Sequence, residues 1–304
     1  MRKFLSFTFL IPLLLYGVYD RPGSTTAQLL KIGCHARAVG MGEAYIAVAD
    51  DASALYYNPA CLARVNGYSM FATHIPWFAN INYEYVGIAK SFTRVGTFGV
   101  SFGTLYTDKM PVRTILRPEG TGEYFYCSDF VLGFTYATFL TDKTAIGFTL
   151  KYVGMYLYVY SAGTICCDIG TYYWTGWHNV RFGMRIANFG PYLKFMHEMC
   201  PLPTMFSFGV ADEVIETDMY KLTVAVNVDK PTDSKERLAI GCEYWYGNMF
   251  AVRAGYKIGH DSETWSTGVG FVQHVGKLRF SINCAYTHYE GLKDVYRLTL
   301  GVAI

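Results

Sequence analysis

Charged side chains are scarce in this sequence. They make up 16% of its 304 residues, whereas a soluble domain carries roughly 25%. Hydrophobic residues account for 52% and aromatic residues for 17%, with 26 Tyr, 21 Phe and 30 Gly. The mean hydropathy is +0.16. A chain with so much apolar surface to bury folds, so the composition excludes an intrinsically disordered protein.

Long hydrophobic runs are also missing beyond the N-terminus. No apolar stretch after residue 27 approaches the ~20 residues that a membrane-spanning helix needs, and this excludes a helical membrane protein. The formal net charge is +2, without the basic run or face that is typical of nucleic-acid-binding proteins. We therefore expect no nucleic-acid partner.

Motifs of catalysis are absent as well. The sequence has no nucleophile elbow, phosphate loop or metalloprotease helix, and its seven histidines lack metal-ligand spacing. We predict that the protein is not an enzyme and holds no metal or cofactor. The eight cysteines fit no disulfide framework or zinc motif. We expect mostly free thiols, with a Cys34–Cys61 bridge as the open alternative.

Residues 1–27 have the features of a secretory signal peptide. Arg2 and Lys3 form its charged start, and the apolar stretch 4–16 is too short to span a membrane. Gly17 and the stretch 25–27 are both candidate cleavage sites. We exclude residues 1–27 from the predicted fold.

From residue 66 to residue 304, apolar residues alternate with polar or small ones. Residues 180–186, 250–258, 278–286 and 296–304 show this pattern clearly, and it places one apolar and one polar face on each strand. A soluble β-sandwich would also alternate. The length of the segments, the charges confined to one face and the Tyr and Trp at segment ends favour an all-β, transmembrane, antiparallel up-and-down β-barrel.

Turn residues divide this region into about fourteen strands. We expect them to begin near residues 67, 81, 95, 123, 143, 162, 177, 203, 217, 234, 248, 262, 275 and 294. Short turns alternate with longer gaps at 106–122 and 190–202, as in outer-membrane barrels, where the long loops lie outside the cell. The last strand ends at Ile304 and would pair with the first, leaving no open edge.

Glycines recur at positions that would face the barrel interior. They include Gly147, Gly183, Gly241, Gly255 and Gly268. We interpret them mainly as sites of strand kinks or bulges. The alternative is that they mark where an internal segment approaches the wall.

Residues 28–65 break the alternation. Gly40-Met41-Gly42 predicts a flexible turn. Asp50 and Asp51 precede a short helix-prone stretch at 52–56, where an acidic residue can cap free N–H groups, and Asn58-Pro59 ends it. This region forms a small module ahead of the first long strand.

The run from Gly33 to Ala63 resembles the N-terminal signature of the PorV/PorQ (UPF0164) proteins, which are part of the FadL-like outer-membrane superfamily. The matching pieces are 37–42, 47–52 and 58–60. The resemblance implies a fourteen-stranded barrel whose lumen is plugged by an N-terminal hatch, residues 28–65, with the barrel at 66–304. It nominates as hatch motif Arg37, Gly40, Met41, Gly42, Asp50, Asp51, Asn58, Pro59 and Ala60.

Basic residues fall on the predicted inward face of the strands. The candidate lumen-facing cations are Lys151, Arg181, Arg185, Arg253, Lys257, Arg279 and Arg297. Inward acids are fewer, namely Asp168, Asp229 and Glu243. We expect the positive wall to pair with the hatch acids Glu43, Asp50 and Asp51, because buried charges need partners. The alternative is that some cations meet the carboxylate or phosphate of an amphiphilic ligand.

Three functions follow from the resemblance and the predicted fold. The first is a FadL-like protein that binds hydrophobic or amphiphilic compounds or passes them across the outer membrane of a Gram-negative (diderm) bacterium. It predicts a continuous apolar tunnel through the lumen. The second is a PorV-like accessory of type IX secretion that binds cargo or the translocon. The third is a passive structural protein. In each case the outer-membrane lipid surrounds the barrel.

Overall fold

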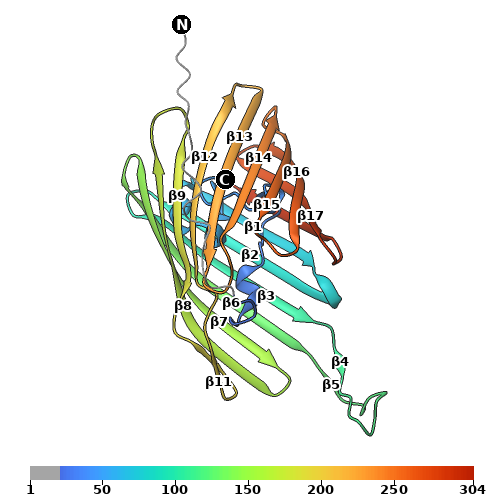
Figure 1. Cartoon of the computed structure of the whole chain (residues 1–304). Coiled ribbons are helices and arrows are strands. Elements are labelled where there is room, and N and C mark those ends of the chain that lie inside the picture. The colour runs from blue at the N-terminus through green and yellow to red at the C-terminus, as the bar shows by residue number, and fades with distance from the viewer. Residues whose placement is uncertain (1–20) are drawn as a thin grey trace.

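The alternating segments form fourteen antiparallel strands that close into one barrel (Figure 1). The computed structural model describes residues 21–304, so the apolar stretch 4–16 of the predicted signal lies outside the described residues. The barrel strands are β1 (Tyr68–Pro76), β2 (Ile81–Phe92), β3 (Gly96–Thr107), β6 (Cys127–Thr141), β7 (Thr144–Leu157), β8 (Tyr160–Trp174), β9 (Arg181–Phe189), β12 (Met205–Glu216), β13 (Tyr220–Pro231), β14 (Arg237–Tyr246), β15 (Phe250–Ile258), β16 (Glu263–Val275), β17 (Leu278–Tyr289) and β18 (Val295–Ala303). Each begins within four residues of its predicted start; the widest offsets are at β6 and β9, expected near 123 and 177.

The last strand closes the barrel against the first. β18 pairs with β1 from Ala303 opposite Ser69 to Leu298 opposite His74. Every other barrel strand pairs with its neighbours along the sequence. The closed, fourteen-stranded antiparallel fold is therefore confirmed, and no barrel strand leaves a row of unpaired backbone groups at an open edge.

The apolar face of each strand points outward. In β15 the side chain of Val252 is 58% exposed, whereas the next one, Arg253, is 1% exposed. Leu298 of β18 is likewise exposed between the buried polar residues Arg297 and Thr299. A soluble sandwich would bury its apolar face, and so large an exposed apolar surface marks contact with another apolar phase.

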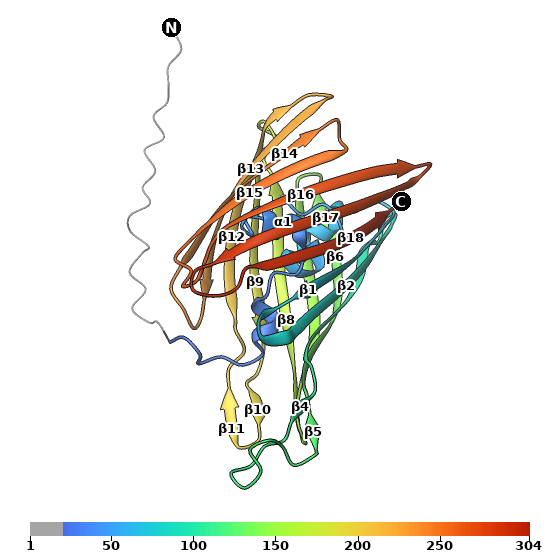
Figure 2. The ribbon, with the colours of Figure 1, turned by 90° about the vertical axis from the view of Figure 1, so that its right-hand side faces the viewer.

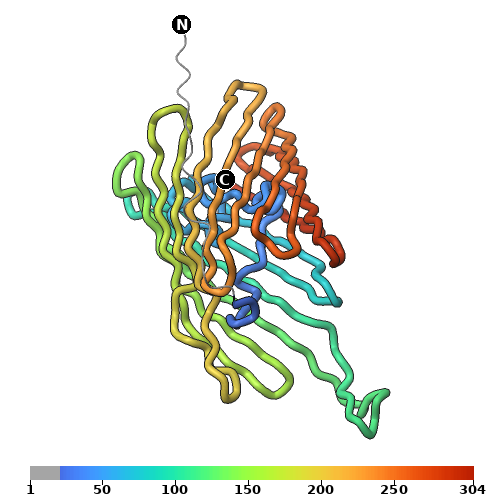
Figure 3. Tube along the Cα trace, viewed as in Figure 1, coloured from blue at the N-terminus to red at the C-terminus, as the bar shows by residue number. Residues whose placement is uncertain are grey.

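The connections at the two ends of the barrel differ. The two long ones lie at the same end, which we call the long-loop end (Figure 2). One contains the hairpin of β4 (Met110–Pro111) and β5 (Tyr124–Phe125), and the other contains β10 (Leu193–Phe195) and β11 (Glu198–Cys200). The tube in Figure 3 shows both hairpins projecting beyond the barrel. The predicted pattern of short turns and long loops is therefore confirmed.

The N-terminal segment lies inside the barrel (Figure 2). It contains η1 (Gln28–Lys31), α1 (Ala36–Gly40), α2 (Ala54–Tyr57) and η2 (Pro59–Arg64), and a further short turn, η3 (Phe78–Asn80), joins β1 to β2. Leu29, Met41, Leu55 and Leu62 of the segment are fully buried. They fill the lumen because many wall residues around them are small or polar.

The helices of this segment differ in part from the prediction. α1 was not predicted. Its N-cap is His35, which lies before the motif at 37–42, and the His35 Nδ1 accepts from the Arg37 backbone N–H at 3.2 Å. The turn at 40–42 is present, and Gly42 adopts φ +64°, a conformation that favours glycine. α2 falls at 54–57 instead of 52–56. Among residues 21–304, none of the helices is long and apolar enough to cross a membrane.

Ordered contacts begin before residue 28. The Thr25 hydroxyl donates to Asp233 at 2.6 Å, the Thr26 N–H donates to the Pro201 carbonyl at 3.0 Å, and Ala27 is buried. Residues that we excluded from the fold as part of the signal peptide therefore pack against the connections at the long-loop end.

Candidate functional site

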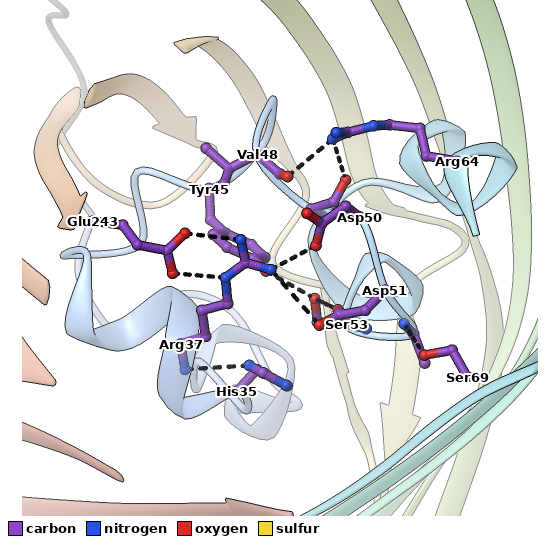
Figure 4. Close-up of polar contacts among 12 residues, drawn as sticks. His35, Arg37, Tyr45, Val48, Asp50, Asp51, Ser53, Arg64, Ser69 and Glu243 are labelled. Atoms are coloured by element: carbon purple, nitrogen blue, oxygen red, sulfur yellow. Dashed lines mark hydrogen bonds and ion pairs between the residues drawn. The ribbon is translucent and has the colours of Figure 1, made fainter. Parts of the chain in front are cut away.

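The N-terminal segment is anchored to the wall by Arg37 of α1. Its Nε and Nη2 each donate to a carboxylate oxygen of Glu243 in β14 at 2.8 Å, and its Nη1 bonds Asp50 at 2.5 Å (Figure 4). The Glu243 side chain is fully buried. A two-point bond between a guanidinium and a carboxylate fixes orientation as well as distance. Arg37 therefore joins α1 and the loop that contains Asp50 to one wall strand.

A second guanidinium completes this group. Arg253 of β15 donates from Nε to Glu243 at 2.6 Å and from Nη1 to Asn283 at 3.0 Å. The Trp245 ring lies 6.0 Å from the Arg37 guanidinium carbon and 5.5 Å from that of Arg253, within the range of cation–π attraction. We call Arg37, Asp50, Glu243 and Arg253 the Arg37 network. Its two cations balance its two carboxylates, which a low-dielectric site requires.

Two titratable groups of the segment respond to this environment. Burial on its own would raise the pKa of Asp50, but the Arg37 guanidinium beside it holds that pKa well below its usual value. Burial lowers the pKa of His35 to about 4. The neutral ring of His35 suits its role, because a protonated Nδ1 could not accept the Arg37 N–H that begins α1.

Asp51 has a local role. Its Oδ1 accepts the Ser53 backbone N–H at 2.9 Å just before α2, but α2 itself has no side-chain cap. Its other oxygen lies 3.8 Å from Arg37. The prediction that Asp50 and Asp51 pair with cations of the wall is wrong, because the cation that they meet belongs to the segment itself, while the wall supplies the buried carboxylate.

The Asn58-Pro59-Ala60 element packs against β7, β8 and β9. The Asn58 amide donates to the carbonyls of Ile46 at 2.9 Å and Thr171 at 3.1 Å, and its Oδ1 accepts the Ala60 N–H at the start of η2. A single amide thereby holds the segment to itself and to strand β8. Pro59 follows it at the first helical position, where a missing N–H costs nothing.

Inward glycines make this fit possible. A Cβ on Gly170 would lie 2.1 Å from Asn58 Oδ1, and one on Gly147 would lie 2.2 Å from the Pro59 carbonyl carbon. A Cβ on Gly255 would lie 2.0 Å from the Gly42 backbone N. The approach of Gly268 to Gly40 is looser, because a Cβ on Gly268 would lie 3.2 Å from the Gly40 Cα. Our main interpretation of the inward glycines as kinks or bulges is therefore wrong at Gly147 and Gly255. They are the places where the segment touches the wall.

The candidate lumen cations lie on the inner face, as predicted, but most are neutralised by the wall itself. Lys151 pairs with Asp168 at 2.5 Å and Arg181 with Glu213 at 2.9 Å, and Arg253 pairs with Glu243. Lys257 joins Glu43 of the segment, at 3.0 Å, and Glu263 of the wall. The wall is thus less positive than the sequence suggested.

Two of the other three candidates bond neutral groups, and the third lines a cavity. Arg185 donates to the Tyr56 carbonyl at 2.5 Å. Arg297 donates to the Gly33 carbonyl at 3.1 Å and to the Thr287 hydroxyl at 2.8 Å. Arg279 is half-buried and lines a small cavity that Asp51 also lines.

Sequence reasoning missed several members of this site. Glu213 and Glu263 neutralise wall cations, yet they lie near strand ends, where the inward and outward faces are hard to assign. Asn188 accepts from Lys151 at 3.0 Å and donates from its backbone to Asp168 at 2.8 Å. It occupies a register shift between β8 and β9 with φ +59°. The run Asn188-Phe189-Gly190 at the end of β9 is a local signal that could have found it.

Two cavities lie beside the N-terminal segment. The first, of about 50 Å³, is lined by residues that include Tyr57, Arg185, Asp229 and Arg237; the second, of about 20 Å³, lies next to His35. Both are much smaller than the ~150 Å³ cavity that is known to bind benzene in an engineered protein. Neither cavity is the continuous apolar tunnel that passage of hydrophobic compounds predicts.

The site has few groups suited to metal or redox chemistry. Residues 21–304 bring together no group of three or more His, Cys, Asp or Glu side chains that could hold a metal ion. All eight cysteines fall within these residues and are free thiols. Cys34 and Cys61 are buried, and burial raises the pKa of the Cys61 thiol to about 12.

Several solved structures have a fold similar to this barrel. The fold is similar to the CymD monoaromatic hydrocarbon channel (TM-score 0.59, 12% identity, 89% of this chain and 96% of that one). It is similar to a Pseudomonas aeruginosa FadL homologue (0.56, 9%, 88% and 97%) and to the Pseudomonas putida toluene transporter TodX (0.53, 10%, 87% and 96%). No protein-family model and no curated protein matches the sequence. The FadL-like part of the predicted resemblance thus agrees with the fold, whereas the PorV/PorQ part finds no support.

Proposed function

We propose that this protein is an outer-membrane β-barrel that lets hydrophobic or amphiphilic compounds pass, with residues 28–65 as the hatch of its lumen. The observation that carries the proposal is the combination of an apolar outer belt with an internal segment bonded to the wall through Arg37 and Glu243. The belt suits lipid, and the segment obstructs direct diffusion. The fold-level likeness to hydrocarbon channels supports the same class of cargo.

Passage requires a rearrangement of this structure. The cavity of about 50 Å³ is too small for an aromatic ring, so a compound has to displace part of the segment or part of the wall. The Arg37 network is the strongest polar attachment of α1 to the wall. We infer that its release accompanies opening, and that the long-loop end, with the β4–β5 and β10–β11 hairpins, faces the outside of the cell.

The test is uptake by intact diderm cells. Cells that produce the protein are compared with cells that produce a fourteen-stranded control barrel of similar size. We expect faster uptake of labelled toluene and no change in uptake of a polar sugar of similar mass. Equal rates of toluene uptake in the two strains would contradict the proposal. Faster uptake of both compounds would indicate a non-selective pore instead.

A further inference from the structure

One carboxylate lies among apolar side chains on the inner wall near the long-loop end. Asp129 of β6 is in register with Leu105 of β3 on one side and with Met155 of β7 on the other. The register of β6 is continuous from Asp129 to the buried residues Val131 and Ala137, so the Asp129 side chain points into the lumen as theirs do. We call Asp129, Leu105 and Met155 the Asp129 surface.

Asp129 has no counter-ion on the wall. The nearest inward neighbours of the Asp129 surface are uncharged, namely Tyr83, Tyr85, Gly103, Val131, Val153 and Ala162. Within residues 21–304 the Asp129 carboxylate makes no hydrogen bond or ion pair, and the Thr104 hydroxyl bonds only its backbone carbonyl, at 3.2 Å. On the lumen side η1 lies against β6, and its one charged residue, Lys31, pairs with Asp233. The charge of Asp129 is therefore uncompensated.

The side chains of the Asp129 surface are accessible. Each of the three is half-buried, whereas Tyr83 on the same row of the wall is fully buried. Leu105 and Met155 lie at the edge of the hydrophobic core that the N-terminal segment forms with the wall, and the Thr26 hydroxyl contacts Met155 Sδ at 3.3 Å. The surface therefore lies where the wall meets the first residues of the N-terminal segment, at the end that we infer to face the outside of the cell.

Two other inward carboxylates of the wall have cations beside them. Asp168 pairs with Lys151, and Glu243 bonds two guanidinium groups. Asp129 differs, because within the described residues it has only its apolar neighbours. An ionised carboxylate that loses water without gaining a partner is unfavourable. Any compound that covers Asp129 therefore has to supply the missing positive charge or bind weakly.

A compound with an ammonium group on an apolar body meets both requirements of this surface. The ammonium group donates to the carboxylate, and the body covers Leu105 or Met155, which lie on strands ~4.8 Å from β6. A neutral hydrocarbon gains only the apolar contact, and an anion is repelled. We propose that the Asp129 surface binds amphiphilic amines and selects them among the compounds that the barrel passes. Selection during passage rests on the proposed function, whereas binding does not.

Equilibrium dialysis of the purified protein in detergent tests the proposal with three labelled probes of similar shape. They are phenethylammonium, the neutral 2-phenylethanol and the anion phenylacetate. We expect phenethylammonium to bind at least tenfold more tightly than the alcohol, and phenylacetate to bind more weakly than either. Protein-free micelles measure how much of each probe partitions into the detergent, and this amount is subtracted.

Variants assign the preference to Asp129. Asp129→Asn keeps the shape and removes the charge, so it should lower the affinity for phenethylammonium at least tenfold and change that for the alcohol less than twofold. Leu105→Ser should weaken both probes at least threefold. Asp108→Asn removes an exposed carboxylate of the neighbouring connection; it is the matched control and should change neither affinity. Heat-modified migration on gels confirms that each variant is folded.

The outcomes separate this inference from the proposed function. Equal affinities for the ammonium compound and the alcohol, no binding of any probe, or equal losses in Asp129→Asn and Asp108→Asn would overturn the inference, even if cells take up toluene faster. Binding of phenethylammonium through Asp129 without faster uptake of toluene would support the binding site and contradict the proposed passage.

Discussion

Arg37 and Glu243 form a two-point ion pair inside the barrel although 206 positions separate them in the sequence. The pair joins the first helix inside the lumen to the middle of the barrel wall. Because both charges are buried, each depends on the other and on Asp50 and Arg253 for compensation. The position of the internal segment is therefore coupled to the integrity of one wall strand.

Glu243→Gln tests this coupling. The substitution keeps the shape and removes the charge that Arg37 and Arg253 share, so we expect the free energy of unfolding to fall by about 3–5 kcal/mol, the usual effect of breaking a buried ion pair. Urea unfolding followed by tryptophan fluorescence measures it. Glu84→Gln removes the carboxylate of the exposed His74–Glu84 pair and should cost less than about 1 kcal/mol. Equal effects of the two changes would contradict the assigned role of Glu243.

Gly255→Val should displace the internal segment. Its Cβ would lie 2.0 Å from the Gly42 N and 2.3 Å from the Met41 carbonyl carbon, and backbone atoms cannot swing aside as a side chain can. We expect Cys34 and Cys61 to become reactive toward a maleimide, whereas in the unaltered protein their burial raises both pKa values and keeps them protonated.

Ala254→Val is the control for that experiment. Ala254 is the neighbouring residue of β15, and its side chain points outward. It places the same valine side chain on the same strand without touching the segment, so labelling of the two cysteines should stay at its original level. Identical labelling of both variants would show that the strand, not the contact with Gly42, governs access.

Stability should fall with acidification between about pH 6.5 and pH 4. Burial lowers the pKa of His35 to about 4 and that of His260 to about 3, so the unfolded chain binds more protons in this range and unfolding becomes easier as the pH falls. The slope is on the order of 1 kcal/mol per pH unit for each such histidine. Asp50, with its lowered pKa, stays ionised in the folded protein, but in the unfolded chain it takes up protons below about pH 5, so it adds to the loss of stability at the acid end of this range.

Variants separate these contributions. His35→Asn keeps a side chain that can accept the Arg37 N–H and should flatten the pH dependence of the free energy of unfolding. His274→Asn, at an exposed position, should leave it unchanged. If both variants keep the full slope, His35 does not titrate as inferred.

The mature chain should retain Thr25. Its hydroxyl bonds Asp233, the Thr26 N–H donates to the Pro201 carbonyl, and Ala27 is buried. Cleavage at 25–27 would therefore remove packed residues. Cleavage near Gly17 leaves them in place. Intact-mass measurement of protein isolated from its membrane decides between the two sites, and a mature N-terminus at or beyond residue 26 would contradict the prediction.

Much of the barrel could be predicted because neighbouring residues in the sequence determine where each strand lies and which face is apolar. Alternation with period two assigns each side chain of residues 250–258 to one face, and turn residues such as Gly247-Asn248 mark where strands end. The candidate site was predicted only in part. The Asn58-Pro59-Ala60 element and Arg37 were found through a recognisable motif, whereas Glu213, Glu263 and Asn188 are isolated residues whose importance depends on partners elsewhere in the chain.

The sequence by itself determined that the chain forms long amphipathic strands, which face of each strand is apolar, and that residues 28–65 differ from the rest. Only the tertiary structure decided which groups meet in the lumen. Closing the barrel brings Gly255 to Gly42, Glu243 to Arg37, and Asp229 near the guanidinium groups of Arg185 and Arg237. Such contacts depend on the path of the internal segment through the closed barrel, and no local pattern encodes that path.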